Sequence, residues 1–323
     1  MSAKKPRIAI TIGDPAGIGP EIILKSLQSE ELRHSANLVI AGSREVLTKQ
    51  SRIFCPTGFW ESILSSPDVE LLDIPVPGAP VEFGQVSASC GVASYRYLKE
   101  AISLAKTEKV DGIVTAPVHK EAWKAAKVPY IGHTEALAEL FNSTAETLFV
   151  VDDLRIFFLT RHVSLREAID LITVDRTLLI LRHAKEALKR FNISEPRIAV
   201  AGLNPHAGDG GLFGDEEIKI LKPAVDIANK EGILAFGPLP ADSVFHQCAQ
   251  CEFDAVIALY HDQGHIASKM RSFLGTVSVT TGLPVIRTSV DHGTAFDIAG
   301  KNRADPASMI AAVKLGAKLA ACK

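Results

Sequence analysis

The sequence lacks most features that mark exported, membrane-bound or nucleic-acid-binding proteins. Its five cysteines are odd in number and scattered, which disfavours a disulfide framework and is typical of a reducing cytoplasm. No apolar run approaches the roughly 18 residues of a membrane span, and the apolar start at residues 8–13 is too short for an export signal. A net charge of -2 without a long basic run predicts no surface for nucleic acid or anionic membrane. We therefore expect a cytoplasmic protein whose partners are small molecules.

The standard nucleotide-binding fingerprints are missing as well. Residues 13–21 (GDPAGIGPE) are rich in glycine and lie between an expected strand and an expected helix. Their glycine spacing fits neither the dinucleotide fingerprint nor a P-loop, and no lysine follows. Such a loop can present backbone N–H groups to an anion, or it can simply make a tight turn. The sequence leaves both alternatives open.

Length and composition predict an ordinary globular α/β protein. With 323 residues, 47% of them apolar and 22% charged, one large or two medium domains are expected. Strands are predicted at residues 7–12, 37–41, 111–115, 147–151, 197–203, 254–260 and 276–280. Helical periodicity is found at residues 91–107, 174–191, 216–231 and 306–321. This alternation predicts parallel sheets flanked by helices. Loops at 127–132 and 282–284 divide the chain into 1–130 plus 284–323, an outer domain, and 131–283, an inner domain.

Three histidines each follow a short apolar run that is typical of a buried strand. His162 follows residues 155–160, His206 follows residues 197–204, and His261 follows residues 254–260. Side chains just beyond the carboxyl ends of parallel strands can converge on one crevice. Three neutral imidazoles with one open position suit a catalytic divalent metal. The alternative is that each ring only terminates its strand, and the long spacings match no compact zinc motif.

Other chemically capable residues lie near these strand ends. His133 and Thr134 precede an expected helix, and dense glycine surrounds His206. Lys269 and Arg287 are cations that suit a phosphate or carboxylate if they share the histidine cleft. Singly, each is more often a solvated surface charge. The pair of cysteines at 248 and 251 has redox or metal spacing, but it lies in an expected helix without a second pair.

Six segments together resemble the 4-hydroxythreonine-4-phosphate dehydrogenase family of pyridoxal phosphate biosynthesis. They occur in order over nearly the whole chain, at residues 13–21, 132–135, 202–208, 238–242, 260–264 and 286–294. Residues 292–302 (HGTAFDIAGKN) also resemble the adenosine-binding loop of isopropylmalate and isocitrate dehydrogenases. The resemblance implies the fold of those enzymes, which has two α/β/α domains with a cleft between them.

The resemblance also implies roles for individual residues. It implies one divalent metal (zinc, cobalt or magnesium) held by His162, His206 and His261, and substrate contacts from His133, Thr134, Lys269 and Arg287. It places NAD, or NADP, against His292, Gly293, Thr294 and Asp297. It further implies a homodimer whose subunits share the active site. The general base stays unassigned, with His133 and Asp242 among the alternatives.

The implied reaction is metal-dependent oxidation of the C3 hydroxyl of 4-phosphohydroxy-L-threonine, followed by decarboxylation. An alternative substrate is D-threonate or D-erythronate 4-phosphate from sugar-acid catabolism, because Ser278 stands where an asparagine is expected and the loop at residues 211–217 differs. Ser278 is therefore left without a role. A metal-dependent hydrolase is an alternative of another class, since three histidines equally suit attack by metal-bound water. A non-catalytic sugar-phosphate binding protein is a third.

Overall fold

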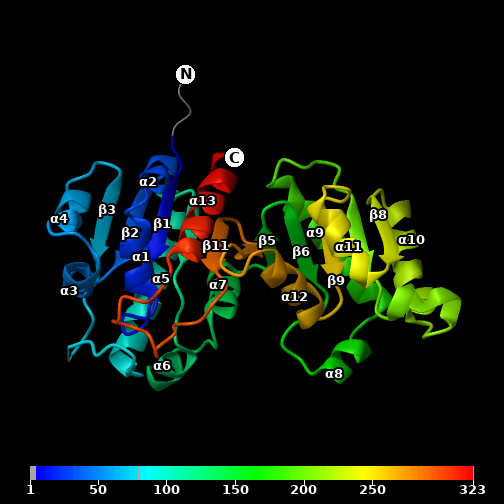
Figure 1. Cartoon of the computed structure of the whole chain (residues 1–323), viewed down its shortest axis with the longest axis horizontal. Helices are drawn as coiled ribbons and strands as arrows, with labels where there is room; N and C mark the ends of the chain where they lie inside the picture. The colour runs from blue at the N-terminus through cyan, green and yellow to red at the C-terminus, as the bar shows by residue number, and fades with distance from the viewer. Residues whose placement is uncertain (1–4, 79, 323) are drawn as a thin grey trace. The chain divides into compact units, whose positions relative to one another are not determined.

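The apolar runs predicted as strands form the centres of two α/β units in the computed structural model, which describes residues 5–78 and 80–322 (Figure 1). Unit 1 contains the chain up to Glu146 together with Val277–Ala321. Unit 2 is the continuous stretch Thr147–Thr276. The prediction of an α/β fold in two parts is confirmed.

Most strands of unit 1 are buried on both faces, as near-continuous apolar runs predict, and the edge strand at Val69–Asp73 is half exposed. In spatial order they are β3 (Val69–Asp73), β2 (Asn37–Gly42), β1 (Arg7–Thr11), β4 (Gly112–Thr115), β11 (Ile286–Val290) and β10 (Val277–Thr281). All of these pairs are parallel except β10 with β11, which is antiparallel. The prediction of parallel sheets holds for the other pairs of this unit and fails at β10.

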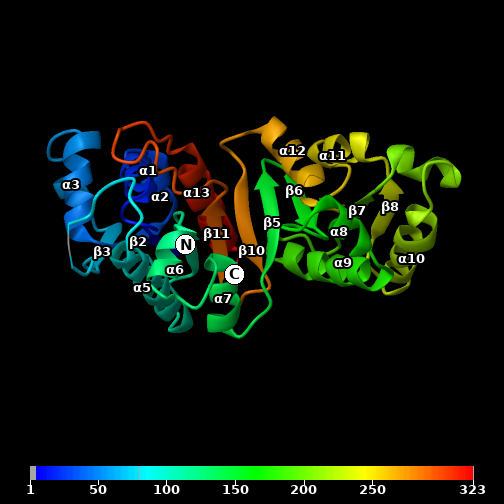
Figure 2. The same ribbon diagram turned by 90° about the horizontal axis from the view of Figure 1, so that it is seen from below.

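Helices cover both faces of these strands (Figure 2). They are α1 (Gly19–Ser26), α2 (Glu30–Ser35), α3 (Arg44–Phe54), α4 (Phe59–Leu64), α5 (Ala88–Lys106), α6 (Lys120–Ala125), α7 (His133–Phe141) and α13 (Ala307–Ala321). Helix α13 packs closely on β11 because Gly316 has no side chain: a Cβ atom there would lie 2.9 Å from the Thr288 hydroxyl. The same hydroxyl donates to the Ala312 carbonyl at 2.7 Å. This packing fixes the strand that carries Arg287.

Unit 2 has its own layered arrangement. Its strands are, in spatial order, β5 (Glu146–Val151), β6 (Leu154–Phe158), β9 (Ala255–Ala258), β7 (Ile198–Ala201) and β8 (Ala235–Leu239). Its helices are α8 (Leu165–Asp170), α9 (Val174–Lys189), α10 (Lys222–Lys230), α11 (Ala241–Ala249) and α12 (His261–Arg271), with a 3-10 segment η1 (Pro205–Gly211) and a π-helical segment η2 (Glu217–Leu221). Figure 2 shows α11 and α12 on one face of the strands and α9 and α10 on the other. Strands β6, β9 and β7 are parallel neighbours, whereas β5 and β6 form an antiparallel pair.

The boundaries between the units differ from the predicted ones. The first crossing lies after Glu146 and the second before Val277, whereas 130/131 and 283/284 were expected. The reason is helix α7, whose Ala136 and Leu137 are fully buried in the core cluster of unit 1 beside Trp123. Residues 131–146, with His133, therefore belong to the unit that was expected to exclude them.

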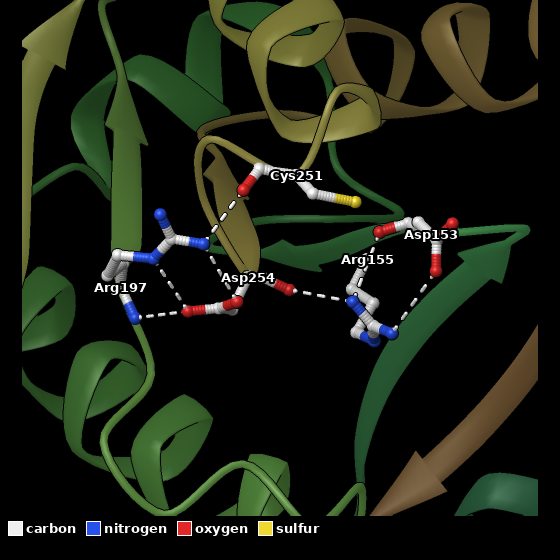
Figure 3. A network of polar contacts seen from close by, with 5 residues as sticks. All are labelled: Asp153, Arg155, Arg197, Cys251 and Asp254. Carbon is white, nitrogen blue, oxygen red and sulfur yellow. Dashed lines mark hydrogen bonds and ion pairs between the residues drawn. The ribbon is translucent and has the colours of Figure 1, made fainter.

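A polar network holds together the amino ends of three strands in unit 2 (Figure 3). The Arg197 backbone N–H and guanidinium donate to the Asp254 carboxylate, and Arg197 Nη2 donates to the Cys251 carbonyl at 2.8 Å. Arg155 Nη1 donates to the Asp254 carbonyl at 3.2 Å. Cys248 is fully buried, and burial raises the pKa of its thiol to about 11. These contacts connect the amino ends of β6, β7 and β9.

Candidate active site

The three predicted metal ligands all lie at the carboxyl edge of the strands of unit 2. His162 follows β6, His206 follows β7, and His261 is the first residue of α12, directly after β9. Because β6, β9 and β7 are adjacent and parallel, their carboxyl ends border one edge. The backbone therefore supports the placement that the sequence predicts.

Two of these histidines lie side by side. The ring centroids of His162 and His261 are 5.7 Å apart, and both rings line a pocket of about 300 Å³ with Arg161, Tyr260 and Asp262. Two imidazoles on one tetrahedral zinc, with Zn–N bonds of about 2.1 Å, would have centroids roughly 5 Å apart. The observed spacing therefore fits two ligands of one ion.

The ring of His261 is oriented by a carboxylate. Its Nδ1 atom lies 2.6 Å from Asp262 Oδ1, which leaves Nε2 as the nitrogen for a metal. A carboxylate of this kind fixes the tautomer and raises the basicity of a histidine ligand. Sequence reasoning missed Asp262, although its place directly after a candidate ligand was a usable signal.

His206 lies apart from the other two rings. It is exposed in segment η1, where residues 206–210 all have left-handed φ values. Over residues 5–78 and 80–322, no three histidine, cysteine, aspartate or glutamate side chains are grouped so that they could hold a metal ion. A single chain therefore assembles two of the three predicted ligands.

In unit 1, Arg287 is a buried cation without a carboxylate partner. Its side chain on β11 belongs to a residue only 4% exposed, and its guanidinium donates to the hydroxyls of Thr280 (2.8 Å) and Thr115 (2.6 Å). Its Nε atom is buried without a hydrogen bond, and no ion pair of the described residues includes it. Burial lowers the pKa of Arg287 to about 10. A buried cation of this kind is stabilised by a bound anion.

His133, at the start of α7, is electrically coupled to Arg287. Burial and the positive charge of Arg287 hold the pKa of the His133 imidazole well below its ordinary value, so the ring is neutral at physiological pH. Its Nε2 atom is buried without a hydrogen-bond partner, and its ring packs edge-on against Trp123. The next residue, Thr134, is half-buried. Unit 1 thus brings together three of the four predicted substrate contacts near β11 and the start of α7.

Lys269, the fourth predicted contact, belongs to unit 2. It lies on α12 with its ammonium group 5.1 Å from the centre of the Phe273 ring. The distance between Nζ and the Phe273 carbonyl is 3.4 Å. The three predicted metal ligands and Lys269 therefore come from one unit, and Arg287 with His133 from the other.

The predicted cofactor residues lie in one loop, and a backbone hydrogen bond from the glycine-rich opening holds this loop in place. The Thr294 carbonyl accepts the Ile18 N–H at 3.0 Å, and Thr294 is buried. Gly293 is open, with no atom within 4 Å of the place a Cβ would take. His292 is half-buried and Asp297 is exposed. A ligand can approach Gly293 while Thr294 anchors the loop.

The glycine-rich segment at residues 13–21 packs against this loop. The Ala16 N–H donates to Asp14 Oδ1, the Gly17 N–H donates to the Asp14 carbonyl, and the Ile18 N–H donates to the Thr294 carbonyl. These three amides bind acceptors within the protein, which supports the tight-turn alternative for this part of the segment. A Cβ atom at position 17 would lie 3.0 Å from the Thr294 Cβ atom, so the close approach of the two segments favours glycine there.

A second contact holds the far end of the same loop. Glu21 is fully buried, and its Oε1 atom accepts the Ala304 N–H at 2.9 Å and the Lys25 ammonium at 2.8 Å. The Lys25 ammonium also donates to the Ala304 carbonyl at 2.8 Å. The opening segment therefore holds the loop both at Thr294 and at Ala304.

Asp14 is a buried acid that sequence reasoning did not assign. It is completely inaccessible, and burial raises the pKa of its carboxyl group to about 6, although nearby backbone amides of Ala16 and His119 lower it. Its Oδ2 atom has no hydrogen-bond partner. The only usable signal was its place directly after Gly13, in the loop that follows β1.

None of the helices in the described part of the chain is long and apolar enough to cross a membrane.

The sequence matches the family described as pyridoxal phosphate biosynthetic protein PdxA over residues 33–316. A relative from Halalkalibacterium halodurans, named "Putative D-threonate 4-phosphate dehydrogenase", is 48% identical over 326 residues, covering 98% of each chain.

Solved structures resemble the chain over its whole length. The 4-hydroxythreonine-4-phosphate dehydrogenase of Klebsiella pneumoniae has a TM-score of 0.88 at 40% identity, covering 98% of this chain and 99% of that one. The terephthalate 1,2-cis-dihydrodiol dehydrogenase of Burkholderia xenovorans has a TM-score of 0.66 at 29% identity, with coverage of 97% and 98%.

Proposed function

The chain belongs to the family of the pyridoxal phosphate biosynthetic protein PdxA and is a dehydrogenase, and on this premise we propose that it oxidises a four-carbon hydroxy acid phosphorylated at C4. The hydride acceptor is NAD, and the oxidised product loses carbon dioxide. The hydrolase alternative is set aside, because the relatives and structural neighbours are named dehydrogenases.

The observation that carries the substrate class is the buried Arg287 guanidinium without a carboxylate partner. A four-carbon acid with a C4 phosphate is anionic at both ends, and the planar guanidinium suits two-point contact with either group. Lys269 provides the second cation. Together they make small dianionic or trianionic substrates the favoured class.

His133 contributes a neutral hydrogen-bonding group beside this cation. With the ring uncharged, its free Nε2 atom can accept a hydrogen bond from a substrate hydroxyl or ammonium group, or donate one to a substrate oxygen, according to its tautomer. Thr134 adds a hydroxyl at the start of the same helix. These two residues orient the substrate without adding charge.

His292, Gly293, Thr294 and Asp297 are the proposed contacts to NAD. The open backbone at Gly293 suits close approach of a ligand, and the anchors at Thr294 and Ala304 fix the loop that carries it. The exposed carboxylate of Asp297 would repel the 2′-phosphate of NADP. We therefore favour NAD over NADP.

The donor set His162, His206 and His261 suits zinc or cobalt better than magnesium, which prefers oxygen ligands. The spacing of His162 and His261 fits two ligands of one ion. A bound divalent metal would lower the pKa of the substrate hydroxyl and stabilise the enolate left by decarboxylation. Asp262 keeps the His261 ring in the tautomer that leaves Nε2 unprotonated.

The reaction balances with NAD as the only oxidant. The C3 hydrogen leaves as hydride to the nicotinamide, and the hydroxyl proton leaves to a base, which yields a ketone beside the carbon that bears the carboxylate. Such a β-keto acid loses carbon dioxide, and the resulting enolate takes up one proton. Arg287 holds one anionic end of the substrate throughout.

We place D-threonate 4-phosphate ahead of 4-phosphohydroxy-L-threonine. Relatives near 48% identity carry the first name, and the matched structures near 40% identity carry the second. Ser278, half-buried on β10 and paired in register with Ser289, offers a hydroxyl where an amide was expected. D-Erythronate 4-phosphate is the epimer to be compared.

A second copy of the chain would complete the site. Unit 2 exposes large apolar side chains, among them Met270 (83%), Leu212 (72%) and Phe273 (71%), which suits burial in a homodimer. We propose that the three histidines meet across such a dimer. Mixing the inactive His162→Ala and His206→Ala proteins should then restore one intact site per mixed dimer. No recovery after subunit exchange would refute a shared site.

The proposed activity is tested by NADH formation with zinc- or cobalt-reconstituted protein and each of the three phosphorylated acids. We expect turnover, fastest with D-threonate 4-phosphate, and coupled release of carbon dioxide. Arg287→Met is the matched control and should be folded but inactive. Absence of NADH with all three substrates, despite bound metal and NAD, would refute the proposed function.

A further inference from the structure

The loop that carries His206 has an unusual backbone. Residues 206–210 are successively left-handed, and His206, Ala207 and Asp209 are not glycines. A left-handed conformation costs free energy at each residue that has a Cβ atom. A run of this kind persists only where surrounding contacts determine it.

Glu217 provides such contacts. Its carboxylate is 3% exposed, and Oε1 accepts the backbone N–H groups of Leu203 (2.8 Å) and Asn204 (2.7 Å). Its Oε2 atom accepts the Asn204 side-chain amide at 2.8 Å. These three donors hold the two residues that lead into the left-handed run.

No cation pairs with Glu217 among the ion pairs of the described residues, so its charge is stabilised by amide dipoles alone. The carboxylate also lies close to the left-handed residues 206–210: a Cβ atom at Gly208 would be only 2.9 Å from Glu217 Oε2. Glu217 therefore contacts the segment on both sides of His206.

Two further features hold the segment at residues 202–204 in place. Glu217 opens the π-helical segment η2, and π-helical turns occur frequently at functional sites. Gln263 on α12, two residues after His261, accepts the Leu259 N–H and donates to the Gly202 carbonyl at 2.8 Å. The segment at residues 202–204 is thus held from η2 and from the helix that begins with His261.

We propose that Glu217 is a positioning residue that fixes the left-handed loop so that His206 is presented as a ligand at the carboxyl edge of unit 2. This inference rests on the proposed function for the identity of the ligand. The new claim is that the conformation of the His206 loop depends on the buried Glu217 carboxylate, which acts by binding backbone amides and not by pairing with a cation.

The test uses Glu217→Gln in the full chain, with Co²⁺ as the probe. The glutamine keeps one carbonyl oxygen but replaces the other acceptor by an NH₂ group facing the Asn204 amide. We expect Co²⁺ affinity, titrated by the visible absorption of the bound ion, to fall about 10- to 100-fold. The Kd for NAD should stay unchanged, since the nucleotide loop belongs to unit 1.

Glu216→Gln is the matched control. Glu216 accepts only the Asn204 side chain, at 2.6 Å, and contacts neither backbone amide. It should change Co²⁺ affinity less than twofold. Glu217→Asp keeps the charge but withdraws the carboxylate, so its affinity should lie between those of wild type and Glu217→Gln, and it serves if the glutamine variant does not fold.

Two outcomes would overturn the inference: wild-type Co²⁺ affinity and spectrum in Glu217→Gln or Glu217→Asp, or equal losses in Glu217→Gln and Glu216→Gln. Hydrogen exchange of the Leu203 and Asn204 amides gives a readout that needs no metal, and it should accelerate in Glu217→Gln alone. If the wild type binds no Co²⁺, the metal centre of the proposed function fails, and the amide exchange still decides the role of Glu217.

Discussion

Replacing Arg287 by methionine should make the protein more stable and inactive at once. Methionine is unbranched, flexible and apolar, so it can occupy the buried space of the arginine stem. The change removes a buried charge that has only the hydroxyls of Thr115 and Thr280 as partners. It also removes the cation proposed to bind the substrate.

The size of the effect follows from the pKa of Arg287. Burial lowers it from 12.5 to about 10, so the folded state disfavours the charged form. At about 1.4 kcal/mol per pKa unit, the charge costs roughly 3 kcal/mol at every pH below about 10, and the cost fades between about 10 and 12.5. Loss of two hydrogen bonds offsets about 1 kcal/mol each. The net gain is about 1 kcal/mol, or a rise of roughly 2–4 °C in Tm.

The assay is thermal unfolding at pH 7.5 with and without the phosphorylated substrate. We expect Arg287→Met to unfold at a higher temperature than wild type without ligand and to gain nothing from the substrate, whereas wild type gains. Activity should fall by at least about 10²- to 10³-fold, because removing one partner of a buried ionic contact costs about 3–5 kcal/mol. A lower Tm without ligand, or substrate stabilisation equal to that of wild type, would refute the reasoning.

Four other predictions concern groups described above. In Arg287→Met the pKa of His133 should rise, because one of the two causes that lower it is gone; an unchanged imidazole titration by NMR would contradict this. Burial raises the pKa of Asp14 to about 6, so ionisation of its carboxyl costs the fold about 3 kcal/mol as pH rises from about 4 to above 6. Asp14→Asn should therefore match wild type in urea unfolding near pH 4 and exceed it at pH 7.5. Glu21→Gln should weaken NAD binding several-fold without changing metal content, as measured by calorimetry and elemental analysis. His206→Ala should lose metal and turnover but keep its NAD affinity, and full metal content with full activity would remove His206 from the ligand set.

Much of the fold could be predicted because its strands are buried on both faces. Runs such as 7–12, 37–41 and 254–260 are apolar without interruption, and each contains a strand, β1, β2 and β9. Three strands were missed. The edge strand β3 is half exposed, and the edge strand β8 contains Pro238, which is tolerated at a sheet edge but interrupts a strand pattern. The interior strand β11 is fully buried, but three of the five residues in its sequence IRTSV are polar, so it shows no apolar run. The unit boundary was missed because the buried face of α7 is visible only in the packing.

Some residues of the candidate site could be predicted from the sequence and others could not. Strand-end position was enough to place His162 and His261 at one edge, because the topology of a parallel sheet is regular. The left-handed backbone of His206 and the buried state of Arg287 depend on contacts between residues far apart in the chain, such as Thr115 with Arg287. No local pattern records those contacts. The residues that act through others, Asp14 and Glu217, were missed for the same reason.

The division of the chain also sets the order in which it can fold during synthesis. Unit 2 is continuous, so it is complete once Thr276 has emerged from the ribosome. One edge of β4 stays unpaired until β11 has been synthesised, because Gly112 of β4 pairs with Ile286 of β11. Unpaired edges invite association with other chains. The nascent polypeptide therefore carries an unfinished first unit through most of its translation, and slow elongation between residues 147 and 276 should increase its demand for chaperones.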